Sequence, residues 1–474
     1  MNNAMQNLIG KTITAKSGNS FILTEIAGSG AQGVVYKENS GKYMVKFYYP
    51  HNEPQLDKDI IDRLSFIKNV KKPGNFVEIR DLIDYPYTGY VMDRVIDHKP
   101  LNSYLIHDRT IKFADWYNSR NGFRERLYIG YIIAKAFYAL SEDNLSYCDI
   151  SGNNILVKFS NNTISVRMID IDNIYIAGRG TSAVLGTPRY IAPEVISRAR
   201  NPDVFSDNYS LAVILFELLR IGHPYVGKEV DDGTPEDEEA AYAGERDYVA
   251  PDEENMLPEE TVFTGSLKEL FRRCFIAGKE NRMERPSARE FEFALLDACN
   301  KVIKCPSCGS WHYPKDDICP WCESVSKPTA YLIFYDKMFN VHPDINAARE
   351  DGKGKGITTY FLREGRNIIY SSYALRAVNS SEAGWGNKNE NYFSIVKKDS
   401  EYHAYNEFSK DDIYVKKFQS AEFKKIKARE AEPLASGDEI FFDSPDNGNE
   451  KTVVRNRDKE YKIIRTAIFA EKKT

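Results

Sequence analysis

The sequence of 474 residues has no apolar run that approaches the roughly 20 residues needed to cross a bilayer. Its first residues, Met1 to Asn7, lack the basic and apolar regions of a signal peptide. A strong charge imbalance is also absent, because 64 Lys and Arg face 69 Asp and Glu, for a formal net charge of −5. No global field therefore favours nucleic acid or an anionic membrane as a partner. These absences predict a cytoplasmic protein with no membrane span and no nucleic-acid partner.

Cysteine is scarce too, with seven in the chain. Three stand alone and four form two C-x-x-C pairs: Cys148, Cys274 and Cys299, then Cys305 with Cys308 and Cys319 with Cys322. An odd count that includes a paired cluster argues against a disulfide framework. Four thiolates about 2.3 Å from one ion complete a tetrahedron, so we expect a structural Zn²⁺ on the two pairs. A redox-active dithiol is the less favoured alternative. We expect His312 at the surface, because four cysteines suffice as ligands.

A polar loop runs from Tyr147 to Val157 and ends in a short apolar strand. It presents Asp149 and Asn154 with the spacing D-x-x-x-x-N, and Asp170 follows at the end of the next apolar run. Two carboxylates and an amide at adjacent strand ends can hold Mg²⁺ against the phosphates of a nucleotide while one carboxylate accepts a hydroxyl proton. The spacing therefore predicts a phosphoryl-transfer site.

This pattern resembles the catalytic loop of protein kinases, H-R-D-x-x-x-x-N, followed by their D-F-G magnesium loop. The resemblance implies that Asp149 is the catalytic base and that Asn154 and Asp170 bind Mg²⁺ beside ATP.

The match departs from the kinase pattern at three places. Tyr147-Cys148 replaces His-Arg, so no Arg reads a phosphorylated activation loop, and we expect activity without that phosphorylation. Ser151 replaces a Lys that touches the transferring phosphate. Losing one stabiliser of transition-state charge lowers a rate by about 10²–10³. Asp170-Ile171-Asp172 replaces D-F-G.

Short apolar runs between residues 12 and 48 predict β-strands, and a G-x-G-x-x-G motif lies between two of them. A glycine motif in this place resembles the loop that covers the phosphates in kinases, whereas a dinucleotide-binding motif precedes a helix. Lys46, in an apolar strand, is expected to point into the cleft and pair with the α and β phosphates. The run 89–95 resembles the strand leading to the adenine-binding hinge, although an ordinary buried strand fits it equally well. The residues expected to contact the nucleotide are Gly28, Ser29, Gly30, Gly33, Val35, Met44, Lys46, Asp93, Val95 and Leu156.

The resemblance also implies an acidic partner for Lys46 on the helix that follows. Apolar residues at positions 56, 60, 64 and 67 predict that helix, but it carries no Glu at a suitable place. Asp57 and Asp59 are the candidates, with Glu53 a more distant choice, and the sequence does not choose between them.

Residues 124–140 repeat apolar side chains at helical spacing and predict a core helix. Further on, residues 186–194 read G-T-P-R-Y-I-A-P-E, which resembles the end of the activation segment in Ser/Thr protein kinases. On that resemblance Thr187 faces the incoming hydroxyl, and Arg285 pairs with Glu194. Asp207 would fix the backbone of the catalytic loop, and it also reads as the N-cap of the helix that follows.

An acidic stretch covers about residues 229–262. We interpret it as a solvated loop, which is the usual state of such charge runs. A docking surface for basic substrates is the alternative.

From residue 327 onward, short β-like runs are separated by Gly, Asn, Asp and Ser, which predicts a β-sandwich. The run Leu434-Ala-Ser-Gly437-Asp438-Glu-Ile440 resembles the late L-x-x-G-D-x-I strand of forkhead-associated domains, and residues 362–369 are candidates for the first strands. That family binds phosphothreonine through an Arg and a Ser. Residues 370–372, Tyr-Ser-Ser, stand in place of its G-R motif, so phosphopeptide binding has little support.

Together these features predict an α+β protein with a bilobal protein-kinase fold, a small zinc ribbon and a C-terminal β-sandwich-like domain. The expected boundaries are 1–300, with the lobes meeting near residue 95, then 301–326 and 327–474, in line with about three domains for this length. The first part resembles bacterial, eukaryotic-type Ser/Thr kinases, which implies transfer of the γ-phosphoryl of Mg-ATP to Ser or Thr of a protein substrate.

The order of domains is similar to that of bacterial kinases encoded beside a metal-dependent protein phosphatase and a von Willebrand A protein, which implies these two partners. Two other classes stay open. A pseudokinase scaffold fits Ser151 and the missing helix Glu, but not the presence of Lys46 and Asp149. A small-molecule phosphotransferase shares D-x-x-x-x-N but should lack the motif at 186–194.

Overall fold

The computed structural model describes residues 8–50, 54–119, 122–160, 163–176, 186–249, 254, 256–340, 358–362, 366–370, 391–407, 412–442, 453–456 and 459–471. The chain forms two compact units, Met1–Leu296 and Asp297–Thr474. The division falls within the helix α13 (Ala288–Asn300).

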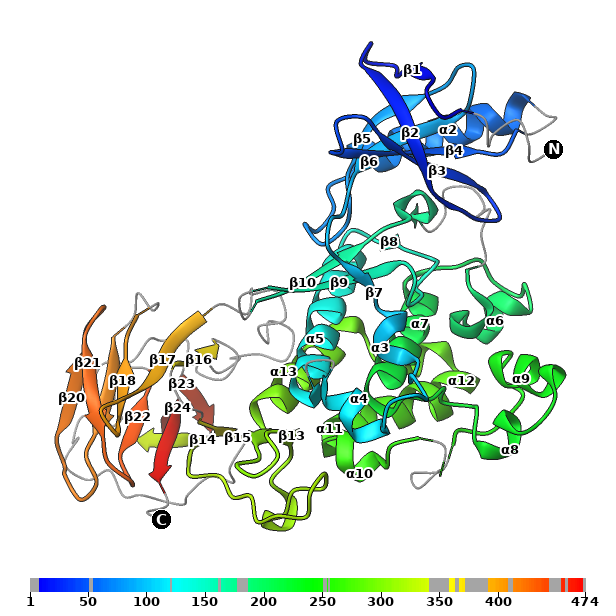
Figure 1. Ribbon diagram of the computed structural model, residues 1–474. Coiled ribbons are helices and arrows are strands. Elements are labelled where there is room, and N and C mark those ends of the chain that lie inside the picture. The colour runs from blue at the N-terminus through cyan, green and yellow to red at the C-terminus, as the bar shows by residue number, and fades with distance from the viewer. Residues whose placement is uncertain are drawn as a thin grey trace. The chain divides into compact units, whose positions relative to one another are not determined.

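The first unit begins with a six-stranded antiparallel sheet in the order β1-β2-β3-β4-β6-β5 (Figure 1). Its strands are β1 (Thr12–Thr14), β2 (Ser20–Ser29), β3 (Gly33–Glu38), β4 (Tyr43–Tyr48), β5 (Ile79–Ile83) and β6 (Gly89–Asp93). Alternate side chains, among them Leu23, Val34, Val45 and Phe47, meet in one buried core, as the period of two in a strand requires. The predicted strands between residues 12 and 48 are confirmed.

Among the described residues, helix α2 (Pro54–Asn69) accompanies this sheet. It packs against β5 and buries Leu64 and Ile67, so the predicted helix is also confirmed. Glu53 lies outside the described residues.

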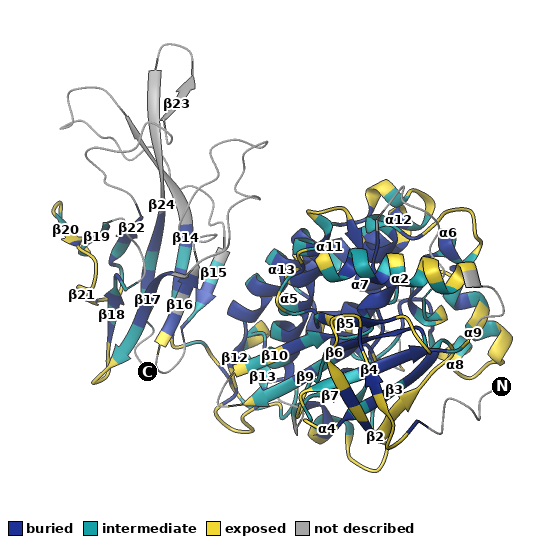
Figure 2. Cartoon of the chain, turned by 90° about the horizontal axis from the view of Figure 1, so that it is seen from above, coloured by how far each residue is buried: buried dark blue, intermediate teal, exposed yellow. Residues whose placement is uncertain are grey.

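The rest of the first unit is mainly helical. Its helices are α3 (Asn102–Leu105), α4 (Phe113–Ser119), α5 (Gly122–Ser141), α6 (Pro193–Ile196), α7 (Val204–Arg220), α8 (Lys228–Asp231), α9 (Pro235–Tyr242), α10 (Glu259–Val262), α11 (Gly265–Arg272), α12 (Gly278–Glu280) and α13. The predicted core helix is α5. Buried residues, dark blue in Figure 2, run along α7 from Ser206 to Arg220. The N-cap of α7 is Asp203, whose side chain accepts from the N–H groups of Phe205 and Ser206. The N-cap expected at Asp207 is therefore wrong, because the helix starts one turn earlier.

Short strands carry the catalytic loop. Strand β9 (Ile155–Ser160) lies between β10 (Thr163–Met168) and β7 (Lys99–Pro100), while β8 (Leu145–Ser146) pairs with β11 (Tyr175–Ile176). The 3₁₀ turn η1 (Ile171–Asn173) follows β10. The loop that holds Asp149 and Asn154 therefore has a strand at each end.

The acidic stretch at 229–262 is not simply a loop, because it contains α8, α9 and α10. Glu259 in this stretch is buried and lies 3.8 Å from Arg220 and 3.1 Å from Lys268. Part of the charge run thus neutralises buried or half-buried cations instead of facing solvent.

Near the start of the second unit, β12 (Ile303–Lys304) pairs with β13 (Trp311–His312); the first cysteine pair lies between these strands and the second follows β13. The remaining strands form two antiparallel sheets. One has the order β15-β14-β24-β22-β19-β20 with β23 beside β24, and the other is β16-β17-β18-β21. Their bounds are β14 (Ala330–Asn340), β15 (Thr358–Phe361), β16 (Arg366–Tyr370), β17 (Asn391–Lys398), β18 (Glu401–Tyr405), β19 (Ile413–Lys416), β20 (Phe423–Ile426), β21 (Ala431–Leu434), β22 (Glu439–Phe441), β23 (Val453–Asn456) and β24 (Lys459–Glu471).

A single hydrophobic cluster contains residues from both of these sheets. Phe393 of β17 packs on Phe442 beside β22 with ring centroids 5.1 Å apart, and Tyr402 of β18 packs on Phe469 of β24 at 5.4 Å. The predicted strand near Asp438 is β22. The carboxylate of Asp438 accepts from the N–H groups of Phe418 and Ala435, both at 2.9 Å, and so fixes the turn before β22.

Within the described ranges, no helix combines the length and the apolarity that a bilayer crossing requires.

Candidate nucleotide and metal sites

A cavity of about 620 Å³ lies in the first unit between the glycine-rich turn and the catalytic loop. Asp149, Ile169, Asp170 and Asn173 line one side of it. The structure brings to its wall every residue that the sequence predicts to contact the nucleotide: Gly28, Ser29, Gly30, Gly33, Val35, Met44, Lys46, Asp93, Val95 and Leu156. Residues from distant parts of the chain therefore converge on one space of the right size for a small ligand.

The glycine-rich turn joins β2 to β3 and is closed by the N–H of Gly30, which donates to the carbonyl of Gly33 at 3.0 Å. A Cβ at Gly33 would overlap the carbonyl oxygen of Phe47 on the neighbouring strand, whereas a Cβ at Gly28 or Gly30 would meet nothing within 4 Å. Gly33 is thus required by the packing of β3 on β4. The space around Gly28 and Gly30 is open, so the backbone at these two glycines can approach a ligand closely.

The carboxylate of Asp149 is held from two sides. The side-chain amide of Asn154 donates to it at 3.0 Å, and the hydroxyl of Thr187 donates to its other oxygen at 2.9 Å. Because Asn154 donates through Nδ2, its side-chain oxygen is the atom that can face a cation. The Ser151 carbonyl accepts the N–H of Asn154 at 3.1 Å, which fixes the turn between them.

The backbone before Asp149 is anchored to the buried helix α7. Asp207 accepts the N–H of Tyr147 at 2.5 Å and that of Cys148 at 3.1 Å, as the sequence predicts. Burial raises the pKa of Asp207 to about 7, against the lowering effect of these two N–H groups. A Cβ at Gly186, whose φ is +105°, would come within 2.7 Å of the Cys148 carbonyl. The start of the 186–194 motif therefore packs directly on the catalytic loop.

Lys46 is 6% exposed and points into the cavity region, as predicted. Its ammonium lies 3.3 Å from Asp170 and 3.0 and 3.1 Å from the two oxygens of Asp172. The prediction that Asp57 or Asp59 pairs with Lys46 is therefore wrong. Asp59 is exposed and accepts from Gln55 at 2.8 Å, and Asp57 is half-exposed.

Asp172 is fully buried and also accepts from two tyrosine hydroxyls, that of Tyr48 and that of Tyr90, the latter at 3.0 Å. Burial acts to raise the pKa of Asp172, but the charge of Lys46 and the tyrosine hydroxyls outweigh it and hold that pKa below its usual value. Sequence reasoning quoted Asp172 but gave it no role. The sequence feature that could have pointed to a buried role for Asp172 is its place as a second carboxylate in a strongly apolar run.

Asp170 stands at the wall of the cavity with a left-handed backbone, φ 55°. Burial raises the pKa of Asp170, although Lys46 acts in the opposite direction. A carboxylate that is mostly buried and only partly neutralised suits a divalent cation, because the ion supplies the missing positive charge.

The 186–194 motif is fixed at both ends. The hydroxyl of Tyr190 donates to the buried Glu217 of α7 at 2.9 Å, and Arg189 pairs with the same carboxylate. Glu194 binds Arg285 through both of its oxygens, as predicted. Residues 177–185, between β11 and this motif, lie outside the described residues.

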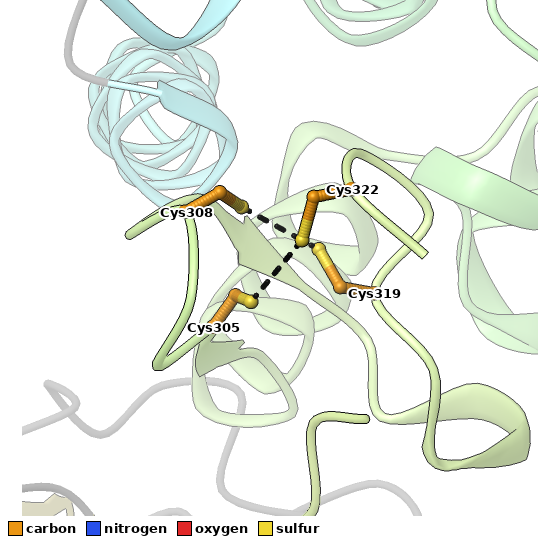
Figure 3. A group of neighbouring side chains, drawn as sticks. All are labelled: Cys305, Cys308, Cys319 and Cys322. Atoms are coloured by element: carbon orange, nitrogen blue, oxygen red, sulfur yellow. Dashed lines mark hydrogen bonds between the residues drawn. The ribbon is translucent and has the colours of Figure 1, made fainter. Parts of the chain in front are cut away.

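A second site lies in the second unit, where the side chains of the four cysteines point toward one another (Figure 3). Cys305 and Cys322 bring their sulfurs within 3.7 Å, as do Cys308 and Cys319, and all four sulfurs lie within 4.8 Å of one another. Hydrogen bonds from Ser324 lower the pKa of Cys322 to about 6, which favours the thiolate that a metal requires. The donor set and its spacing fit a tetrahedral Zn²⁺.

His312 does not belong to this cluster, but its expected surface position is wrong. It is buried, and its ring contacts the Tyr313 carbonyl at 2.7 Å and the Ser326 hydroxyl at 2.8 Å. The ring therefore fills the interior of the small module as a neutral hydrogen-bonding group, with its pKa lowered by burial.

Comparison with known proteins agrees with this geometry. A family model described as the protein kinase domain matches residues 21–293, more than half of the chain, so the chain belongs to the protein kinase family.

Individual relatives share 25–35% sequence identity with parts of this chain. Myosin light chain kinase A of Dictyostelium discoideum is 26% identical over 234 residues, which are 47% of this chain and 74% of that protein. The serine/threonine-protein kinase nekl-2 of Caenorhabditis elegans is 25% identical over 214 residues, 43% of this chain and 58% of that protein. A cGMP-dependent protein kinase of Drosophila melanogaster (isozyme 2 forms cD5/T2) is 35% identical over 99 residues, which are 20% of this chain and 10% of that protein.

Proposed function

We propose that this chain is a Ser/Thr protein kinase that transfers the γ-phosphoryl group of Mg-ATP to a hydroxyl of a protein substrate. One arrangement carries the proposal: the carboxylate of Asp149 is held by Asn154 and Thr187 beside a cavity whose wall includes Lys46 and Asp170. A base, a cation and a carboxylate ligand around one cavity are the parts that in-line phosphoryl transfer requires.

The step forms a bond between the γ-phosphorus and the substrate oxygen and breaks the bond to the bridging oxygen of ADP. Asp149 orients the hydroxyl and accepts its proton. Lys46 binds the α and β phosphates, and the backbone of the glycine-rich turn covers them. Asp170 and the side-chain oxygen of Asn154 hold Mg²⁺, which neutralises charge on the phosphates when it is bound.

The preference for Ser or Thr over Tyr is supported by Thr187 of the 186–194 motif, whose hydroxyl donates to the proposed base Asp149 at 2.9 Å. The printed name of the nekl-2 relative describes a serine/threonine-protein kinase, which agrees with this preference. A nucleotide-binding scaffold without transfer is not favoured, because Lys46, Asp149 and Asp170 all stand in place.

For the second unit, we propose a structural Zn²⁺ on the four cysteines and a β-sandwich built from the two sheets that share one core. The resemblance to forkhead-associated domains rests on the sequence run from Leu434 to Ile440. A bacterial signalling role with a metal-dependent phosphatase and a von Willebrand A protein as partners rests on domain order alone. A cytoplasmic location suits a cluster of four free thiols, since disulfides are rare there.

Transfer of labelled γ-phosphate to a generic Ser/Thr substrate tests the activity. Wild type is expected to transfer and Asp149→Asn to lose transfer while still binding nucleotide. Equal transfer by both proteins would overturn the proposal.

A further inference from the structure

The ammonium of Lys46 sits between two carboxylates that differ in exposure. Asp170 is one-third exposed in its side chain and lines the cavity. Asp172 has no exposed side-chain surface, and both of its oxygens lie within hydrogen-bonding distance of Lys46. Asp172 therefore supports Lys46 from the protein interior, while Asp170 faces the space where a ligand binds.

The side chains around Asp172 stabilise its negatively charged carboxylate. Besides Lys46, the hydroxyls of Tyr48 on β4 and Tyr90 on β6 donate to it. Lys46 and Tyr90 are direct cross-strand partners, so the sheet itself sets the positions of these donors. A buried carboxylate is stable only when such donors compensate its lost hydration, and here three side chains do so.

Helix α2 contributes charge of the opposite sign to this cluster. Arg63 of α2 lowers the pKa of the Tyr48 hydroxyl, although burial and Asp172 together raise that pKa well above 10. Among the described residues, the carboxylates that contact Lys46 are those of Asp170 and Asp172. The helix thus complements the carboxylate of Asp172 and does not itself provide an acid for the lysine.

We infer that Asp172 is the positioning residue that holds Lys46 toward the phosphates of the nucleotide, in place of an acid from α2. This inference rests on the proposed nucleotide site. Lys46 and Asp170 are then aligned by one short turn, η1, because Asp172 and Asp170 belong to the same segment. The alignment of the lysine does not require a carboxylate from α2.

The test uses the full chain and compares the affinities for ATP, ADP and adenosine with the rate of transfer. Asp172→Asn keeps the shape of the side chain and removes its charge. We expect it to weaken ATP and ADP binding about 10- to 100-fold, as for loss of a charged hydrogen bond, with adenosine affinity within about twofold of wild type. Asp59→Asn on the exposed face of α2 is the matched control and should leave all three affinities unchanged.

Tyr90→Phe serves as a second variant that keeps the carboxylate but removes one of its donors. It should reduce the preference for ATP over adenosine by a smaller factor than Asp172→Asn, with melting temperatures of all variants measured alongside. Equal losses for ATP and adenosine, an unchanged preference in both variants, or the same loss in Asp59→Asn would overturn the inference. Because binding is measured separately from transfer, a wild-type protein that prefers ATP but transfers nothing would contradict the proposed activity and leave this inference standing.

Discussion

The guanidinium of Arg285 binds both carboxylate oxygens of Glu194, at 2.7 and 2.8 Å, across 91 residues of chain. Glu194 is the last residue of the 186–194 motif, which contacts the catalytic loop, and lies in the first turn of α6, whereas Arg285 precedes α13. The pair therefore holds the segment that carries Thr187 against the helical core. Both side chains are largely buried, so the charge of each is compensated mainly by the opposite charge of the other.

Replacing Glu194 with Gln should lower the free energy of unfolding by about 2–3 kcal/mol, because Arg285 loses a bidentate charged partner in a largely buried place. Urea unfolding at pH 7 measures the change. Glu245→Gln, at an exposed position, is the control and should shift stability by less than about 0.5 kcal/mol.

The same pair predicts a pH dependence. Burial opposes ionisation, but Arg285 outweighs it and holds the pKa of Glu194 below its usual 4.5. The stabilisation is therefore present above pH 4.5 and is lost as the pH falls through the lower pKa of the folded state. Wild type should be more stable than Glu194→Gln at pH 7, and the gap should close in strong acid. A gap that stays constant with pH would contradict this explanation.

Thr187 should affect the rate more than the fold. Thr187→Val removes the hydroxyl that donates to Asp149 but keeps the shape, so we expect kcat to fall roughly tenfold through loss of one hydrogen bond to a charged group. Thr187→Ser retains the hydroxyl and should keep most of the activity. Steady-state kinetics with a Ser/Thr peptide separates the two variants, and equal losses would show that the hydrogen bond to Asp149 does not by itself account for the effect.

Gly33 and Gly30 give a matched pair in the glycine-rich turn. An added Cβ at Gly33 collides with the backbone of Phe47, whereas at Gly30 it enters open space. Gly33→Ala should therefore destabilise the protein by about 1–3 kcal/mol, as overpacking does, and Gly30→Ala by much less. Thermal unfolding of the two variants side by side is the measurement. Comparable melting temperatures would mean that β3 can move away from β4 without loss.

The cysteine cluster should bind one Zn²⁺ per chain. Native mass spectrometry of the full chain is expected to show one metal ion, retained in Cys274→Ser and lost in Cys305→Ser, since Cys274 lies outside the cluster. Chelation should also expose the cysteine module to proteolysis, because a small metal module derives its folding energy from the ion. A metal-free protein that resists cleavage equally well would argue for a structural role of the thiols themselves.

Local motifs predicted much of this protein. The glycine-rich turn, Lys46 and Asp149 each belong to a short motif that could be recognised by its residue spacing. The motifs occur in the order found in protein kinases, and the structure has all three at the wall of one cavity. The short β-like runs between Gly, Asn, Asp and Ser in the C-terminal third likewise predicted strands, and the run near Asp438 is β22. The polar strands β18 and β20 were not predicted, because their burial depends on neighbours that the local pattern does not specify.

The partner of Lys46 could not be predicted in the same way. Asp172 lies 126 residues further along the chain, and the choice between it and an acid on α2 depends on how the helix faces the sheet. The buried His312 and the buried Glu259 were mispredicted for a related reason. A polar side chain is expected at the surface unless its partners are known, and Ser326 and Lys268 come from other segments.

The most direct test of the account is transfer of labelled γ-phosphate by the wild-type 474-residue chain, Asp149→Asn and Asp170→Ala, with nucleotide binding measured on the same samples. The account predicts transfer to Ser or Thr by wild type, loss of at least about 10²-fold in both variants, and nucleotide binding that persists in Asp149→Asn. Binding without transfer in wild type would contradict the account, and the cavity would then belong to a nucleotide-dependent scaffold.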